Sequence, residues 1–185
     1  MDRELVVRAR SGDHDAFARL VGASIGRLNA IARLMLSDYG LAEDAVQDAL
    51  VDAWRNLRGL RDPDRFHPWL NRVLVRSCQN VRRRDTRRRH VDLILLGSPE
   101  PAQDDVQSSL ARADQLERAL ARLTVEQRAV LVVSYFLDLP LAEAAATLGI
   151  PTGTMKSRLA RALAALRAAI DADERLTIQP AERTA

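Results

Sequence analysis

Basic side chains gather in two segments of the chain, and their types and spacing suit contact with a polyanion. Residues 55–90 contain 12 basic and 3 acidic residues, and residues 151–170 contain 4 basic residues and no acidic one. Residues 91–117 contain 1 basic and 6 acidic residues, so the formal net charge of +3 conceals two separate basic blocks. Each block is a candidate nucleic-acid footprint, although by charge alone a solvated helix face explains it equally well.

In the first block, helical periodicity over Trp69–Arg84 separates a polar face from an apolar face. The polar face carries Arg72, Arg76, Gln79, Asn80 and Arg83. The apolar face carries Leu70, Leu74, Cys78 and Val81, so Cys78 is interpreted as a small buried hydrophobe. A stripe of guanidinium and amide groups suits phosphate contacts, and Trp69 either stacks on an unpaired base or belongs to the core.

An acidic helix, predicted over residues 42–57, directly precedes this basic segment. Its inward stripe is expected to be Val46, Leu50 and Trp54. Its surface carries Glu43, Asp44, Gln47, Asp48 and Asp52. Carboxylates there cannot help to bind DNA, so this face either keeps the chain soluble or docks a basic protein partner.

The second basic block has the layout of a helix-turn-helix motif. Thr124 and Gln127 fit a capping box that opens a helix through Leu137, and a second helix is predicted over residues 141–148. The tight turn that follows contains Gly149, and Thr152 is expected to cap the last helix, predicted over residues 153–170.

The last helix has an apolar stripe and an opposite polar face. Met155, Leu159, Leu163, Leu166 and Ile170 are expected to pack inward. Lys156, Ser157 and Arg161 lie near the N-terminal end of the other side, where a recognition helix enters the major groove. Ala160 beside them offers only an apolar contact, and Arg158 flanks the stripe. An ordinary surface helix has the same pattern, but the preceding turn favours a DNA-reading helix.

These elements predict an all-α fold of two small helical domains joined by a flexible linker. A further helix is expected over residues 16–36, and residues 59–68, with two prolines and a glycine, should form a loop. The predicted divisions are a first domain over residues 1–86, a linker over residues 87–109, a second domain over residues 110–172 and a tail over residues 173–185.

Catalytic and metal-binding classes find no support in the residues. One cysteine cannot form an internal disulfide, and three scattered histidines lack metal-ligand spacing. No nucleophile–base set or glycine-rich phosphate loop occurs, so we expect neither an enzyme nor a cofactor. The charged N-terminus and the absence of a long apolar run predict a cytoplasmic chain without membrane insertion.

Two segments carry a resemblance to a known family. Residues 42–54, AEDAVQDALVDAW, look like sigma region 2.2, and Trp69 with its basic helix looks like regions 2.3 and 2.4. Residues 123–128, LTVEQR, are similar to the start of region 4.1, and residues 149–161, GIPTGTMKSRLAR, to region 4.2. The chain therefore resembles a bacterial sigma factor of the sigma-70 family, in the extracytoplasmic-function (ECF, group 4) class.

The resemblance implies partners and site residues. Asp44, Gln47 and Asp48 would bind the β′ clamp helices of core RNA polymerase, the β flap would be a second polymerase contact, and an anti-sigma factor would be a further partner. The −10 promoter element would contact Arg65, Phe66, Trp69, Arg72, Arg76, Asn80 and Arg83. The −35 element would contact Thr154, Lys156, Ser157, Arg158, Ala160 and Arg161.

The function expected from this resemblance is that of an alternative sigma factor, which directs promoter-specific transcription initiation. The family often has Asn where Arg76 stands and Asp where Asn80 stands, so the promoter sequence does not transfer to this chain. The alternative is a stand-alone helix-turn-helix regulator that binds duplex DNA as a dimer. That alternative leaves the acidic helix and the first basic block without a role.

Overall fold

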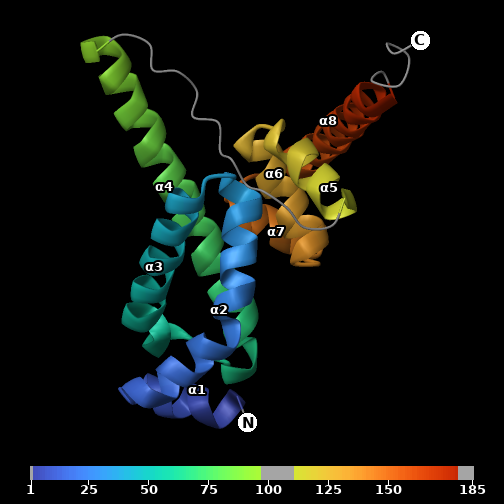
Figure 1. Cartoon of the computed structure of the whole chain (residues 1–185). Helices are drawn as coiled ribbons and strands as arrows, with labels where there is room; N and C mark the ends of the chain where they lie inside the picture. Colours follow the sequence, from blue (N-terminus) through green and yellow to red (C-terminus); the bar gives the residue numbers. More distant parts are fainter. Residues whose placement is uncertain (1, 97–110, 179–185) are drawn as a thin grey trace. The chain divides into compact units, whose positions relative to one another are not determined.

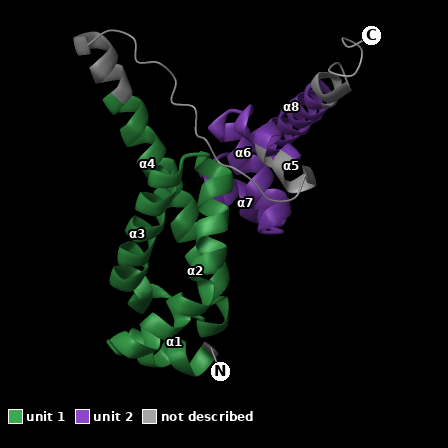
Figure 2. Ribbon diagram, in the orientation of Figure 1, with its two compact units in different colours: residues 1–102 green, residues 103–185 purple. Residues whose placement is uncertain are grey.

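The computed structural model describes the backbone of residues 2–96 and 111–178, and the side chains of residues 3–88 and 115–173 apart from residue 117. All regular elements in those ranges are helical, which confirms the predicted all-α class. The chain divides into two compact units, Met1–Ala102 and Gln103–Ala185 (Figures 1 and 2). In the described ranges, none of the helices has the length and apolar character needed to cross a membrane.

The described residues of unit 1 form four α-helices, α1 (Asp2–Arg10), α2 (His14–Leu36), α3 (Tyr39–Asn56) and α4 (Phe66–Leu96). Two short 3₁₀ turns, η1 (Leu57–Gly59) and η2 (Pro63–Arg65), join α3 to α4. Aspartates cap two of these helices: the Asp13 side chain accepts a hydrogen bond from the backbone N–H of Ala16, and Asp38 accepts one from that of Leu41. Each cap satisfies a donor that the first helical turn leaves unpaired.

The core of unit 1 forms where α2, α3 and α4 pack together. Helix α3 contributes a ladder of alanines, Ala42, Ala45, Ala49 and Ala53, which are all buried. Helix α4 contributes Leu70, Leu74, Cys78 and Val81, as the sequence predicted. Small side chains on α3 let the backbones of the helices approach closely, and the leucines of α4 fill the remaining space.

The inward stripe predicted for α3 is only partly right. Val46 is buried, but Leu50 and Trp54 are half-buried, because the alanine ladder occupies the face toward the core. Trp54 packs instead beside two rings of α2, with centroid distances of 4.2 Å to His14 and 5.1 Å to Phe17.

Unit 2 contains α5 (Ala111–Ala121), α6 (Val125–Leu131), the π-helical turn η3 (Val132–Phe136), α7 (Leu141–Leu148) and α8 (Thr152–Ile178). The predicted capping box at Thr124 and Gln127 is present, with both reciprocal hydrogen bonds. Helix α7 has its predicted bounds and ends at Gly149, whose φ of 67° is left-handed. The N–H of Ile150 closes that turn onto the carbonyl of Ala145 at 3.0 Å, a pattern that ends many helices.

Several predicted boundaries are wrong because helices continue further than the patterns indicated. Helix α4 begins at Phe66 and runs to Leu96, so the predicted loop is shorter and residues 87–96 of the predicted linker are helical. No glycine or proline interrupts residues 69–96, and Pro68 lies in the first turn, where its missing N–H costs no hydrogen bond. The remaining linker residues, 97–109, lie outside the described residues.

Helix α8 also differs from its prediction. Thr152 is already helical rather than a cap, and the helix extends past Ile170 to Ile178, into the predicted tail. The extension is held by Asp173, a buried residue whose carboxylate forms ion pairs with Arg118 of α5 (3.6 Å) and with Arg122, in the turn that follows α5. Residues 179–185 lie outside the described residues.

Candidate polymerase and nucleic-acid interfaces

The acidic face of α3 is exposed, as the sequence predicted. Asp44 and Gln47 are exposed, and Asp48 lies beside them at the edge of the face. The Asp48 carboxylate accepts a hydrogen bond from Arg84 Nη1 at 2.9 Å, an ion pair that joins the acidic helix to the basic helix α4. Both partners are substantially exposed, so this pair contributes at most about 1 kcal/mol. Asp48 is therefore engaged within the chain, and Asp44 and Gln47 are exposed residues of this face.

The basic face of α4 also matches its prediction. Arg76, Asn80 and Arg83 are exposed, and Arg72 and Gln79 are half-buried. The opposite side of the helix is buried by α2 and α3 from Phe66 to Val81. The polar side chains therefore project from one fixed surface, which suits contacts with a nucleic-acid backbone.

Phe66 and Trp69 play different parts in this surface. Phe66 is only 1% exposed, so its ring lies in the core of unit 1 and its contact with the −10 element stays a prediction. Its ring lies 6.1 Å from that of Trp69, which is half-buried. Phe66 therefore supports Trp69 from the core, and Trp69 keeps part of its indole accessible to a stacking base.

The turn before α4 presents Arg65 on the same stretch of surface. Arg65 is exposed, and η2 is fixed by the Asp62 carboxylate, which accepts a hydrogen bond from the backbone N–H of Asp64 at 3.0 Å. Asp64 forms an ion pair with Arg3 of α1. These contacts position the entry to the basic helix.

Cys78 lies on the inner side of α4 and is fully buried. Desolvation raises the pKa of its thiol to about 12, so the thiol stays protonated at neutral pH. The interpretation of Cys78 as a small buried hydrophobe is confirmed.

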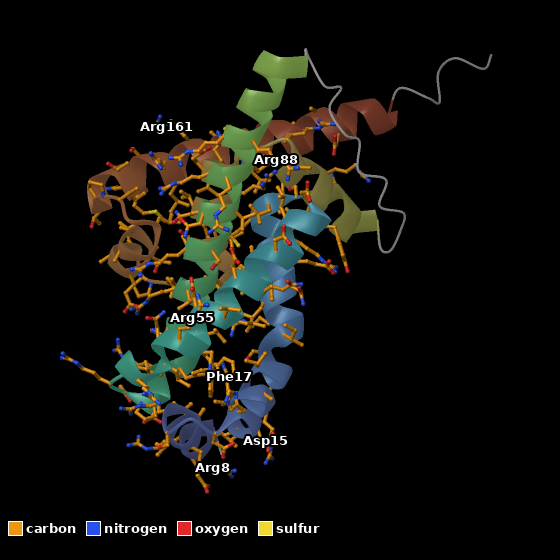
Figure 3. The ribbon with its side chains drawn as sticks, turned by 90° about the vertical axis from the view of Figure 1, so that its left-hand side faces the viewer. Arg8, Asp15, Phe17, Arg55, Arg88 and Arg161 are labelled. Carbon is orange, nitrogen blue, oxygen red and sulfur yellow. The ribbon has the colours of Figure 1, made fainter. Side chains whose placement is uncertain are left out.

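In unit 2, the first turns of α8 carry the predicted recognition residues. Lys156, Ser157, Ala160 and Arg161 are exposed, while Thr154 and Arg158 are half-buried. Ser157 Oγ donates to the carbonyl of Thr154 at 3.0 Å, and Arg161 Nε donates to that of Ser157 at 3.3 Å. Arg161 extends outward from the helix (Figure 3). The Lys156 ammonium makes no ion pair within the described residues, so it is available to a DNA partner.

A shallow cleft of about 220 Å³ separates the start of α6 from α8. Its lining consists of Thr124, Glu126, Gln127, Arg158 and Arg161. Two of the predicted −35 residues, Arg158 and Arg161, therefore line the cleft beside α6.

The apolar side of α8 differs from the predicted stripe. Met155, Ala162 and Ala169 are buried, whereas Leu159, Leu163, Leu166 and Ile170 are half-buried. Helix α8 packs against α5, α6 and α7 along the line of Met155, Ala162 and Ala169, which are spaced seven residues apart. At about 100° per residue, the larger side chains of the predicted stripe lie on one flank of that line.

Two buried charged residues of unit 2 were not predicted. Arg128 is 4% exposed, and its Nη1 donates to the carbonyl oxygens of Leu120 (3.2 Å) and Ala121 (3.3 Å) at the end of α5. Asp173 performs the corresponding role between α5 and α8. A helical periodicity pattern assigns charged residues to the exposed side of a helix, so the sequence did not indicate that either residue is buried.

Together these features define a class of protein: an all-α, two-unit DNA-binding transcription factor with a separate acidic face. The family model for Sigma-70 region 2 matches residues 20–89, and that for Sigma-70, region 4 matches residues 113–166. The ECF RNA polymerase sigma factor SigM of Mycobacterium tuberculosis is 35% identical over 171 residues, covering 89% of this chain and 82% of the relative. The chain belongs to the sigma-70 family, in its ECF class.

A second relative, the RNA polymerase sigma factor CnrH of Cupriavidus metallidurans, is 32% identical over 187 residues, covering 93% of this chain and 95% of that protein. The solved structure of CnrH with the cytosolic domain of CnrY covers 93% of this chain and 98% of its own, with a TM-score of 0.60 and 30% identity. The structure of the sigma factor RpoE with the anti-sigma factor NepR from Bartonella quintana covers 85% and 98%, with a TM-score of 0.67 and 25% identity.

The predicted family and function are thereby confirmed: the chain is an alternative sigma factor that directs transcription. Sigma factors are non-enzymatic initiation factors. The stand-alone regulator is not favoured, since region 2 and region 4 both match.

Proposed function

We propose that this sigma factor binds core RNA polymerase through the acidic face of α3, the −10 element through α4 and the −35 element through α8. The observation that carries the proposal is the juxtaposition within unit 1 of an exposed acidic face and an exposed basic face, linked by the Asp48–Arg84 pair. The first repels DNA and the second attracts it, so the two faces fit different partners.

The polymerase contacts divide between the two units. In unit 1, Asp44, Gln47 and Asp48 would bind the β′ clamp helices. In unit 2, the β flap would bind the exposed apolar side chains of Tyr135 and Phe136 in η3 and Leu141 at the start of α7. Exposed large apolar groups close together in sequence are typical of a protein-binding surface.

At the −10 element, Trp69 would stack on an extruded base while arginines contact the strand backbone. Arg65, Arg72, Arg76 and Arg83, with Asn80, form that contact surface. Extruding a base costs a few kcal/mol. Polymerase binding has to supply this free energy, so the isolated chain should bind promoter DNA weakly.

At the −35 element, the N-terminal part of α8 would lie in the major groove of duplex DNA. Lys156, Ser157 and Arg161 would reach base edges, Ala160 would give an apolar contact, and Thr154 and Arg158 would approach the backbone.

Regulation by a protein inhibitor follows from the same surfaces. CnrH was solved with the cytosolic domain of CnrY, and RpoE with the anti-sigma factor NepR. We expect an anti-sigma factor that covers the polymerase-binding surfaces of this chain, and we expect the chain to act in the cytoplasm with RNA polymerase.

Run-off transcription with purified core polymerase on a pool of genomic templates tests this function. The expected result is a set of discrete transcripts that share −10 and −35 sequences and vanish without the chain. Tight binding to a palindromic duplex site without polymerase would instead identify a stand-alone regulator. Absence of any promoter-specific transcript would contradict the proposal.

A further inference from the structure

One apolar side chain lies in the middle of the acidic face of α3. Val51 is 47% exposed, one of two exposed large hydrophobic residues on this helix. At about 100° per residue, Val51 lies within about 40° of both Asp44 and Gln47 around the helix axis. It lies nine residues after Ala42, half a revolution away from the buried alanine ladder. Val51 therefore points directly away from the core.

The fold gains nothing from a valine at this place. Valine has a lower helix propensity than alanine, and an exposed isopropyl group contributes no core packing. A single exposed apolar residue is common on protein surfaces. Val51 differs from that background because polar and charged residues surround it, with Gln47 and Asp48 one turn before it and Arg55 one turn after it. An apolar centre with a polar rim is how protein interfaces are built.

The charge of the rim restricts the partner. Glu43, Asp44 and Asp52 are exposed on this helix, and Arg55 is an exposed cation beside Val51. The carboxylates outnumber this cation, so the face repels nucleic acid and acidic proteins. The complementary surface carries cationic side chains around an apolar depression. A basic amphipathic helix provides both features on one side.

We propose that Val51 is a contact residue for core RNA polymerase, its side chain entering an apolar depression between the basic groups that bind Asp44 and Gln47. The inference rests on the proposed function, in which this face docks polymerase. It adds a residue that supplies affinity through apolar burial, whereas the acidic residues supply orientation and encounter rate.

The test measures the affinity of the full chain for purified core polymerase, comparing Val51→Ala with Val7→Ala. Val7 is 48% exposed on α1, so it is a matched control away from the acidic face. Both changes raise helix propensity, so neither should lower the unfolding temperature. Val51→Ala should weaken binding about five- to fifteenfold, since two methyl groups leave the interface, and Val7→Ala should change it less than twofold.

Salt dependence separates the apolar contact from its charged rim. The ratio of wild-type to Val51→Ala affinity should stay constant between low and high salt, because apolar burial is not screened. The corresponding ratio for Asp44→Asn should shrink as salt rises. Val51→Thr, which keeps the shape but replaces one methyl group with a hydroxyl, should resemble Val51→Ala.

Each outcome assigns a cause. If the wild-type chain does not bind core polymerase, the proposed function fails. If it binds and the Val51 variants bind equally well, the inference alone is overturned. If they bind polymerase equally well but lose self-association in sedimentation, or lose an anti-sigma partner, then Val51 belongs to that interface and the inference is likewise overturned.

Discussion

The two basic helices, α4 and α8, differ in how much of their apolar side is covered. Leu70, Leu74 and Cys78 of α4 are at most 1% exposed, because α2 and α3 pack along that helix. In α8, Leu159 and Leu163 remain half-buried beside much shorter neighbours. The polar faces of the two helices look alike in the sequence, but the two helices pack differently on their neighbours.

The difference shows how each helix keeps its position. Helix α4 is held by large apolar side chains, whereas α8 packs against α5, α6 and α7 along a line of smaller ones, Met155, Ala162 and Ala169. An ion pair adds to this line, since Asp173 is bound by Arg118 and Arg122. Both helices therefore present a fixed polar face, which suits the −10 role proposed for α4 and the −35 role proposed for α8.

The sharpest way to separate the two units is to remove a polar anchor of unit 2. Arg128→Ala leaves the carbonyls at the end of α5 without their buried donor and should destabilise unit 2 by about 2–4 kcal/mol. Both tryptophans, Trp54 and Trp69, lie in unit 1. Tryptophan fluorescence should therefore show an unchanged transition while circular dichroism shows an earlier one.

The control for this variant is Arg167→Ala, which removes an exposed arginine from α8 and should leave both transitions in place. Coincident early transitions for Arg128→Ala by both probes would contradict the independence of the two units.

The next largest effect should distinguish α8 residues that contact bases from an α4 residue that contacts the DNA backbone. Lys156→Ala and Arg161→Ala should each weaken binding of a −35 duplex by about 1–3 kcal/mol. Each variant should weaken binding of a scrambled duplex much less. Arg83→Ala on α4 should instead weaken binding alike for all sequences, as a phosphate contact does. Fluorescence anisotropy of polymerase holoenzyme on matched and scrambled promoters measures both. Equal losses on both duplexes would make the α8 residues backbone contacts.

Substitutions of two glycines near the start of α8 should change the free energy of unfolding by a smaller amount and in opposite directions. Gly149→Ala forces a Cβ into a left-handed backbone and should cost about 1–2 kcal/mol. Gly153→Ala, in the first turn of α8 with no atom within 4 Å of the added Cβ, should be neutral or stabilising. Denaturant unfolding followed by circular dichroism measures both. A neutral Gly149→Ala would show that the turn tolerates another conformation.

The smallest expected effect concerns the Asp48–Arg84 ion pair, which joins the acidic face of α3 to the basic helix α4. Asp48→Asn releases Arg84 and should tighten binding of the free chain to single-stranded −10 DNA by up to about fivefold. Asp52→Asn makes the same change in net charge on the same helix, and the Asp52 carboxylate makes no ion pair within the described residues. It should have less effect. Equal tightening by both variants would show that only net charge matters.

Much of the fold was predictable because local patterns agree with it. The capping box at Thr124, the bounds of α7 and the apolar face of α4 all depend on residues close in sequence. The ends of α4 and α8 were not predictable. A run of arginines resembles a linker in composition, and Asp173 resembles a solvated tail residue until α5 lies beside it.

The candidate sites divide in the same way. Lys156, Ser157 and Arg161 share one exposed face because helical spacing alone puts them there. The burial of Phe66 was not predicted, since its place in the core depends on how α4 packs. Val51 was overlooked because an apolar residue is expected to be buried, and only the alanine ladder shows which side of α3 faces inward.

The helical class, the family and the two basic faces follow from the sequence, since composition, capping and 3.6-residue periodicity are properties of neighbouring residues. The folded structure adds which side of α3 is buried, the pairing of Asp48 with Arg84, and the anchoring of α5 by Arg128 and Asp173. Those features depend on contacts between helices, whose free energy comes from burial and pairing of groups far apart along the chain.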